Sequence, residues 1–194
     1  PIAYLQGLFG VFGFGTDIAD KIVFFLPVAL FIPLVSYFFS KKLSKSRVGG
    51  VIGSLFFSYN SYFLAIDSQG HLGITLSAGL IMLVMLFLYK FEKTKNIYST
   101  VPILTFLICL IGFYDFRFVY VLALILSIHF LYRCLEGFSV VKNLLNLYIK
   151  VGLIYLGLNV FWLIPFIASS ATSSGVIFSR PLWRSELFNL TRAI

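Results

Sequence analysis

Six stretches of this chain are each long enough and apolar enough to cross a lipid bilayer, and that pattern excludes an ordinary soluble fold. A spanning helix needs about 20 predominantly apolar residues. The stretches are residues 22–39, 48–66, 72–89, 97–113, 116–132 and 151–169, each bounded by charged or turn residues. Since 60% of all residues are apolar and 11% are charged, the composition agrees. We expect an all-α polytopic transmembrane bundle with short hairpin turns.

The two ends of the chain differ from these stretches. Residues 1–16 are apolar but short and contain four glycines, which is typical of a segment that lies in the interface or re-enters the membrane. Residues 17–170 would form the bundle, and residues 171–194 an amphipathic interfacial helix. The chain opens on Pro1 without an initiator methionine and closes on the helical-looking LFNLTRAI, so we expect it to be part of a longer protein.

The basic residues are distributed unequally between the two predicted sides of the membrane. When successive loops are assigned alternately to the two sides of the membrane, one side receives ten basic and two acidic residues, and the other side receives five of each. The basic side holds Lys41, Lys42, Lys45, Arg47, Lys90, Lys93, Lys95, Arg133, Lys142 and Lys150. Such asymmetry places these residues in the cytoplasm and the protein in the plasma membrane. The net charge of +8 is thereby explained by helix orientation and lipid contacts, and nucleic acid is not an expected partner.

Ionisable residues gather in the turns predicted on the outer side. Asp67 and His71 lie between the second and third stretches, and Asp115 and Arg117 between the fourth and fifth. Turns this short require antiparallel hairpins, whose tips can meet at one level. Two interpretations are open: local ion pairing among head groups, or a water-accessible polar pocket. His71 and Asp67 could share a divalent metal only if the turn were helical, and two ligands do not define a site.

Small and polar residues also recur at helical spacing inside the apolar stretches. Gly and Ser stripes indicate close helix packing, whereas an amide indicates either a hydrogen bond to a neighbouring helix or a cavity. The stripes are Gly50, Ser54, Ser58 and Tyr62, and His71, Thr75 and Gly79; the amides are Asn60 and Asn159. We expect a structural role for His129. Cys109 and Cys134 predict neither a disulfide nor a metal site.

The final segment, SRPLWRSELFNLTRAI from Ser179, reads as an amphipathic helix on the outer leaflet. Trp183, Leu187 and Leu190 share one face, and Arg180 and Arg184 lie nearby. Arginines of this kind either anchor the helix among lipid head groups or bind a phosphate with two hydrogen bonds.

The run LFFSYNSYFLAIDSQGHLGITLSAGLIMLVMLFLYKFEK, with the later GFYDFR turn and NVFWLIP stretch, resembles the GT-C type of polytopic membrane glycosyltransferase. It is similar especially to prokaryotic arabinofuranosyltransferase-like proteins and related uncharacterised membrane proteins, and the resemblance covers most of the chain. It implies transfer of a sugar from a polyprenyl-phosphate donor outside the cytoplasmic membrane. Donor and membrane lipids would then be the partners, with other membrane or extracellular subunits an open question.

The resemblance also bears on the site residues. In that family the catalytic acid lies in the first large outer loop after a first span, and no residue here matches it, so the catalytic residue stays unassigned. What the resemblance carries over is a region around Asn60, Asp67, His71, Asp115 and Arg117 that would hold a sugar or phosphate. Aromatic rings stack on sugars, and cations neutralise a leaving phosphate.

Two other functions are compatible with apolar helices that carry polar groups at one membrane surface. A flippase or transporter of lipid-linked sugars would need them too, although the sequence shows no convincing internal repeat and the basic side shows no matching polar membrane residues. A non-catalytic subunit would need only the packing stripes. In that case, replacing Asp67, His71, Asp115 or Arg117 by alanine would leave function intact.

Overall fold

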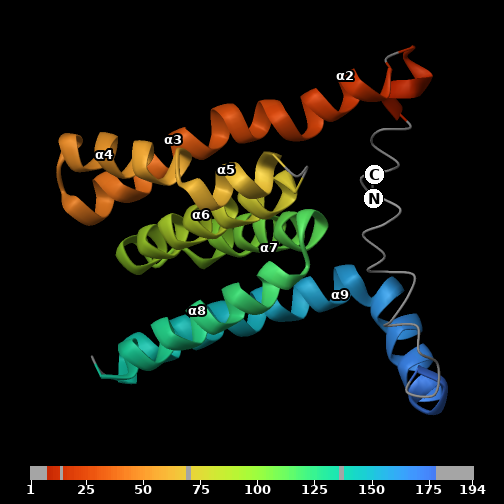
Figure 1. Ribbon diagram of the computed structural model, residues 1–194. Coiled ribbons are helices and arrows are strands. Elements are labelled where there is room, and N and C mark those ends of the chain that lie inside the picture. Colours follow the sequence, from red (N-terminus) through yellow and green to blue (C-terminus); the bar gives the residue numbers. More distant parts are fainter. Residues whose placement is uncertain (1–7, 14, 69–70, 136–137, 178–194) are drawn as a thin grey trace. The chain divides into compact units, whose positions relative to one another are not determined.

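Every regular element of the described chain is a helix. The computed structural model describes residues 8–13, 15–68, 71–135 and 138–177 (Figure 1). The elements in chain order are α2 (Thr16–Asp20), the π-helical turn η1 (Lys21–Phe25), α3 (Leu26–Ser44), α4 (Arg47–Ser58), α5 (Ser61–Ser68), α6 (Leu72–Thr94), α7 (Ile97–Tyr114), α8 (Arg117–Cys134) and α9 (Phe138–Ile177). The chain divides into two units, residues 1–152 and 153–194. The predicted all-α class is confirmed.

Among the described residues, five helical stretches are long and apolar enough to cross a membrane, which favours an integral membrane protein. They are Ile18–Ser44, Leu72–Thr94, Ile97–Tyr114, Arg117–Cys134 and Val141–Val160. Three of them closely match the predicted stretches 72–89, 97–113 and 116–132. The first predicted stretch, 22–39, is continued at both ends, because helical structure runs without a break from α2 through α3.

The prediction of one continuous helix over residues 48–66 is wrong. Instead, α4 ends at Ser58 and α5 begins at Ser61, and neither reaches the length of a spanning helix. The Asn60 side chain explains the interruption, because its Oδ1 accepts the backbone N–H of Tyr62 at 2.8 Å. A short polar side chain that bonds the nearby backbone in this way competes with the helical hydrogen bonds.

The boundaries predicted for the last span are also wrong. Residues 133–150 were expected to form a loop, but α9 begins at Phe138 and continues to Ile177. Lys142 and Lys150 therefore lie on a helix, and both fall inside the membrane-length stretch Val141–Val160. Two apolar residues, Leu144 and Leu147, are buried between these lysines, so packing against the rest of the first unit favours helix over loop. Only residues up to 177 of the predicted tail, 171–194, are described.

Two helices of the first unit end in the same way at one end of the bundle. Lys45 after α3 and Lys95 after α6 both adopt the left-handed conformation with φ of 54°, which is a common way to end a helix. The next helices start at once: Ser46 accepts the N–H of Gly49, and Asn96 accepts that of Ser99. We call the cluster Lys41, Lys42, Lys45, Lys90 and Lys93, carried by α3 and α6, the lysine-rich end.

Three residues of the predicted stripes, Gly50, Ser54 and Gly79, lie where helices of the first unit approach closely, which confirms a packing role for these three, whereas Tyr62 and His71 are exposed. A Cβ on Gly50 of α4 would lie 2.9 Å from Tyr37 Cε2 of α3, and Ser54 Oγ donates to the Pro33 carbonyl at 2.7 Å. Gly79 of α6 packs against Ile32 of α3. Since α6 also runs beside α7 (Figure 1), α6 is the central helix of this packing.

Candidate functional site

Asp67 near the end of α5 is fixed to the start of α6. Its Oδ1 accepts the hydroxyl hydrogen of Thr75 at 2.6 Å, and Thr75 itself is buried. Partial burial raises the pKa of the Asp67 carboxyl, and the hydrogen bond from Thr75 offsets part of that rise. Burial disfavours the charged form of an acid, so this carboxyl is poised to hold a proton more readily than an exposed aspartate.

Asp115 and Arg117 form a two-point ion pair at the start of α8. Arg117 donates from Nε to Oδ1 at 3.0 Å and from Nη2 to Oδ2 at 2.7 Å, and its backbone N–H also reaches Oδ1. These bonds, chiefly that from the Arg117 side chain, lower the pKa of Asp115, and the nearby charge of His71 acts in the same direction. The geometry supports the local ion pair, in which the Arg117 side chain is 76% exposed and the Asp115 side chain 9% exposed.

The start of α6 joins these groups at one end of the first unit. A Cβ on Gly73 would lie 2.9 Å from the Tyr114 carbonyl oxygen, so α6 and the end of α7 nearly touch there. His71 precedes this contact, has an exposed side chain and lies close enough to influence Asp115. We call the group Asp67, His71, Asp115 and Arg117 the polar tip. The expected meeting of the hairpin tips is confirmed by these contacts.

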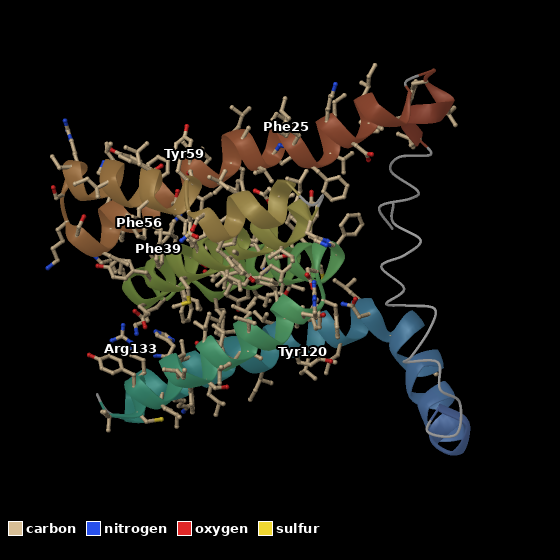
Figure 2. The ribbon with its side chains drawn as sticks, viewed as in Figure 1. Phe25, Phe39, Phe56, Tyr59, Tyr120 and Arg133 are labelled. Atoms are coloured by element: carbon tan, nitrogen blue, oxygen red, sulfur yellow. The ribbon has the colours of Figure 1, made fainter. Side chains whose placement is uncertain are left out.

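Asn60 does not extend the polar tip. It lies in the break between α4 and α5, where its amide oxygen caps α5 rather than bonding a neighbouring helix. A shallow groove of about 700 Å³ adjoins it, lined in part by Phe56 and Tyr59 (Figure 2). Asn159 likewise donates to the Tyr155 carbonyl of its own helix at 2.8 Å. The predicted phosphate ligands Arg180 and Arg184 lie outside the described residues.

A polar network at the other end of the bundle was missed by sequence reasoning. Glu92 of α6 pairs with Arg133 of α8, and its Oε1 lies 3.1 Å from His129 Nε2. The other ring nitrogen of His129 lies 3.0 Å from the Tyr148 hydroxyl of α9. Figure 2 labels Arg133, which reaches from α8 toward α6. The structural role expected for His129 is supported, but the expectation that this side lacks polar membrane residues was wrong.

A groove at the lysine-rich end was missed as well. It lies between α3 and α6 at the lysine-rich end and has a volume of about 1050 Å³. A signal for it was present, since the first and third predicted stretches run in the same direction and both end in lysines. Parallel helices that pack together bring such ends side by side.

The described residues offer few ligands for a metal. Among residues 8–13, 15–68, 71–135 and 138–177, no three His, Cys, Asp or Glu side chains gather as a metal site would require. In the described residues Asp67 bonds Thr75, and His71 lies close enough to Asp115 to act on its charge. The polar tip therefore offers a carboxyl with raised pKa, an imidazole and an exposed guanidinium edge.

Comparison with known proteins leaves the chain without identified relatives. No protein family, no curated protein and no solved structure matches it.

Proposed function

We propose that this chain is a membrane-embedded part of a glycosyltransferase that uses a polyprenyl-phosphate-linked sugar on the side of the membrane facing the polar tip. The observation that carries the proposal is the gathering of Asp67, His71, Asp115 and Arg117 at one end of the first unit, away from the lysines. Charge asymmetry of this kind favours an orientation with the lysines in the cytoplasm and the polar tip outside. The resemblance of the surrounding sequence to GT-C enzymes adds the reaction class.

The polar tip suits a sugar phosphate by its hydrogen-bonding capacity. The Arg117 guanidinium is held by Asp115 through Nε and Nη2, which leaves its remaining N–H groups to meet a phosphate oxygen. The imidazole of His71 can donate to the same phosphate. Asp67, with its raised pKa, can bond a sugar hydroxyl as either donor or acceptor. These are binding roles, and the residue that activates the acceptor is not assigned.

A flippase of lipid-linked sugars is the second candidate, favoured by the break between α4 and α5. Helices interrupted at membrane depth expose backbone groups and often mark the substrate site of a transporter. Tyr59 and Asn60 form such an interruption, and the adjoining groove is lined by Phe56 and Tyr59. Aromatic rings of this kind could follow a sugar across the bilayer.

The decisive experiment measures lipid-linked sugars in cells that lack the protein. Loss of a transferase would make the donor accumulate on the outer leaflet, where membrane-impermeant periodate oxidises its sugar. Loss of a flippase would make the same lipid accumulate on the inner leaflet, protected from periodate. An unchanged lipid pool would contradict both functions.

Point variants then test the polar tip itself. We expect His71→Ala and Arg117→Gln to restore no more than a small part of the lost activity, with Ser127→Ala of α8 as the matched control, because its hydroxyl only bonds the Ala123 carbonyl of its own helix. Full activity of both tip variants would favour the non-catalytic subunit.

A further inference from the structure

We propose that the groove between α3 and α6 is a specific binding site for a phospholipid whose head group carries at least two negative charges. This inference does not depend on the transferase proposal, because the groove lies at the opposite end of the first unit from the polar tip. Its occupant would come from the leaflet that faces the lysine-rich end.

The first support is the uncompensated charge at the mouth of the groove. Five lysines line it, namely Lys41, Lys42, Lys45, Lys90 and Lys93. Helix α3 contains no acidic residue, and the one carboxylate of α6, Glu92, is engaged by Arg133 and His129. In the described part of the chain, no ion pair involves any of these lysines. Like charges gathered this closely repel one another unless an anion binds among them.

The second support is the arrangement of two ammonium groups around one ring. Lys42 Nζ of α3 lies 4.3 Å from the centroid of the Tyr89 ring, and Lys93 Nζ of α6 lies 5.1 Å from it. Such contacts hold a cation over an aromatic face. Tyr89 thereby keeps two lysines from different helices near one position, where they can bind the same phosphate group.

The third support is the apolar wall that continues from the lysines into the groove. Phe31, Leu34 and Phe38 of α3 line the groove together with Leu83 and Phe87 of α6. From Phe31 to Lys41 the wall extends for about 15 Å along the helix axis, at 1.5 Å per residue. That length accommodates much of an acyl chain, whereas a soluble anion would leave the wall uncovered. Basic pockets between membrane helices are a known setting for multiply charged lipid head groups.

The volume fits one lipid rather than a second protein chain. A volume of about 1050 Å³ lies just above the usual range for sites that enclose a drug-sized molecule. Five lysines exceed what a single phosphodiester needs, so we infer a head group with two phosphates or a phosphomonoester.

The experiment uses the full chain purified in detergent and native mass spectrometry. Two probes differ in charge: diphosphatidylglycerol, with two phosphates, and phosphatidylglycerol, with one. We expect one tightly held molecule of the two-phosphate lipid per chain, retained at least fivefold better than phosphatidylglycerol. Lys42→Gln/Lys93→Gln should reduce its retention at least fivefold.

The matched control is Lys142→Gln/Lys150→Gln, which removes the same charge from α9, outside the groove, at two exposed positions. It should change retention by less than twofold, and Lys42→Arg/Lys93→Arg should retain the lipid. An equal loss in both glutamine pairs would reduce the effect to general surface charge and overturn the proposal. Displacement of the lipid by 10 mM inorganic phosphate would overturn it too, since the site would then recognise a soluble anion. Circular dichroism of each variant confirms that it is folded.

Discussion

The link between α6 and α8 offers the sharpest test of the fold, through the substitution Glu92→Gln. Helix α8 is described throughout, and among its residues only Leu122 is buried. Apolar packing against other helices of the protein therefore contributes little to holding α8 in place. The Glu92 pair with Arg133 and His129 is the polar contact found here that joins α8 to α6.

The magnitude follows from the burial of this network. The side chains of Glu92 and Arg133 are only 15% and 22% exposed, so water screens the pair weakly. A hydrogen bond to a charged group contributes about 1.5 to 3 kcal/mol. Glu92→Gln keeps the shape but removes the charge, so we expect the free energy of unfolding to fall by about 2 kcal/mol.

The assay is unfolding in mixed detergent micelles, followed by the labelling rate of Cys109 in a Cys134→Ser background. A double-mutant cycle with Arg133→Gln should give a coupling energy of about 1 to 2 kcal/mol, within the range found for contacting residues. The control cycle combines Asp115→Asn with Arg117→Gln, a pair in which the Asp115 side chain is 9% exposed but the Arg117 side chain is 76% exposed. Because water reaches the arginine partner, the coupling energy of this pair should be about 0.5 kcal/mol, as for surface ion pairs. Coupling energies that are equal in the two cycles would refute the reasoning from burial.

Three further predictions use other parts of the chain. Because the folded-state pKa of Asp67 is raised, ionisation of this carboxyl opposes folding at neutral pH and ceases to do so as pH falls through that pKa. Asp67→Asn should therefore raise the thermal midpoint of unfolding at pH 7. A gain that did not shrink toward low pH would contradict the raised pKa. Gly79→Val should lower the free energy of unfolding by about 1 to 3 kcal/mol, because Ile32 and Phe31 crowd the position. The control Gly157→Val, at a position with open space around it, should change the free energy of unfolding little. Equal effects of the two substitutions would rule out crowding as the cause. The third prediction concerns two single-cysteine variants in a cysteine-free background: Tyr98→Cys near the start of α7 and Phe116→Cys just after its end. An impermeant reagent should label the two cysteines from opposite sides of the membrane. Labelling of both from the same side would remove the basis for placing the polar tip outside.

Residues 72–89, 97–113 and 116–132 show how far local pattern reaches. Each is an apolar run of spanning length closed by charged or turn residues, and each became one helix with ends displaced by at most five residues. Side chains that cap the next helix, such as Asn96, are also local signals. The meeting of the hairpin tips was predicted from the same pattern, since such short turns require the helices on either side to be antiparallel.

Residues 48–66 and 133–150 show where local pattern fails. In the first, a single amide at Asn60 outweighed the apolar run by bonding the nearby backbone. In the second, Leu144 and Leu147 are buried by packing that no sequence window can show, so the part that carries Lys142 and Lys150 is helical.

The sequence alone determined the helical class, the main apolar helices and the separation of lysines from the polar tip, because each depends on residues close together in the chain. Only the tertiary structure decided that lysines of α3 and α6 share one groove, that Glu92 meets His129 and Arg133, and that Asp67 is bonded to Thr75. Those contacts depend on which helices pack against one another when several have similar apolar surfaces. Hydrophobic periodicity does not determine this packing, which follows from side-chain shapes and from the requirement that buried polar groups have hydrogen-bond partners.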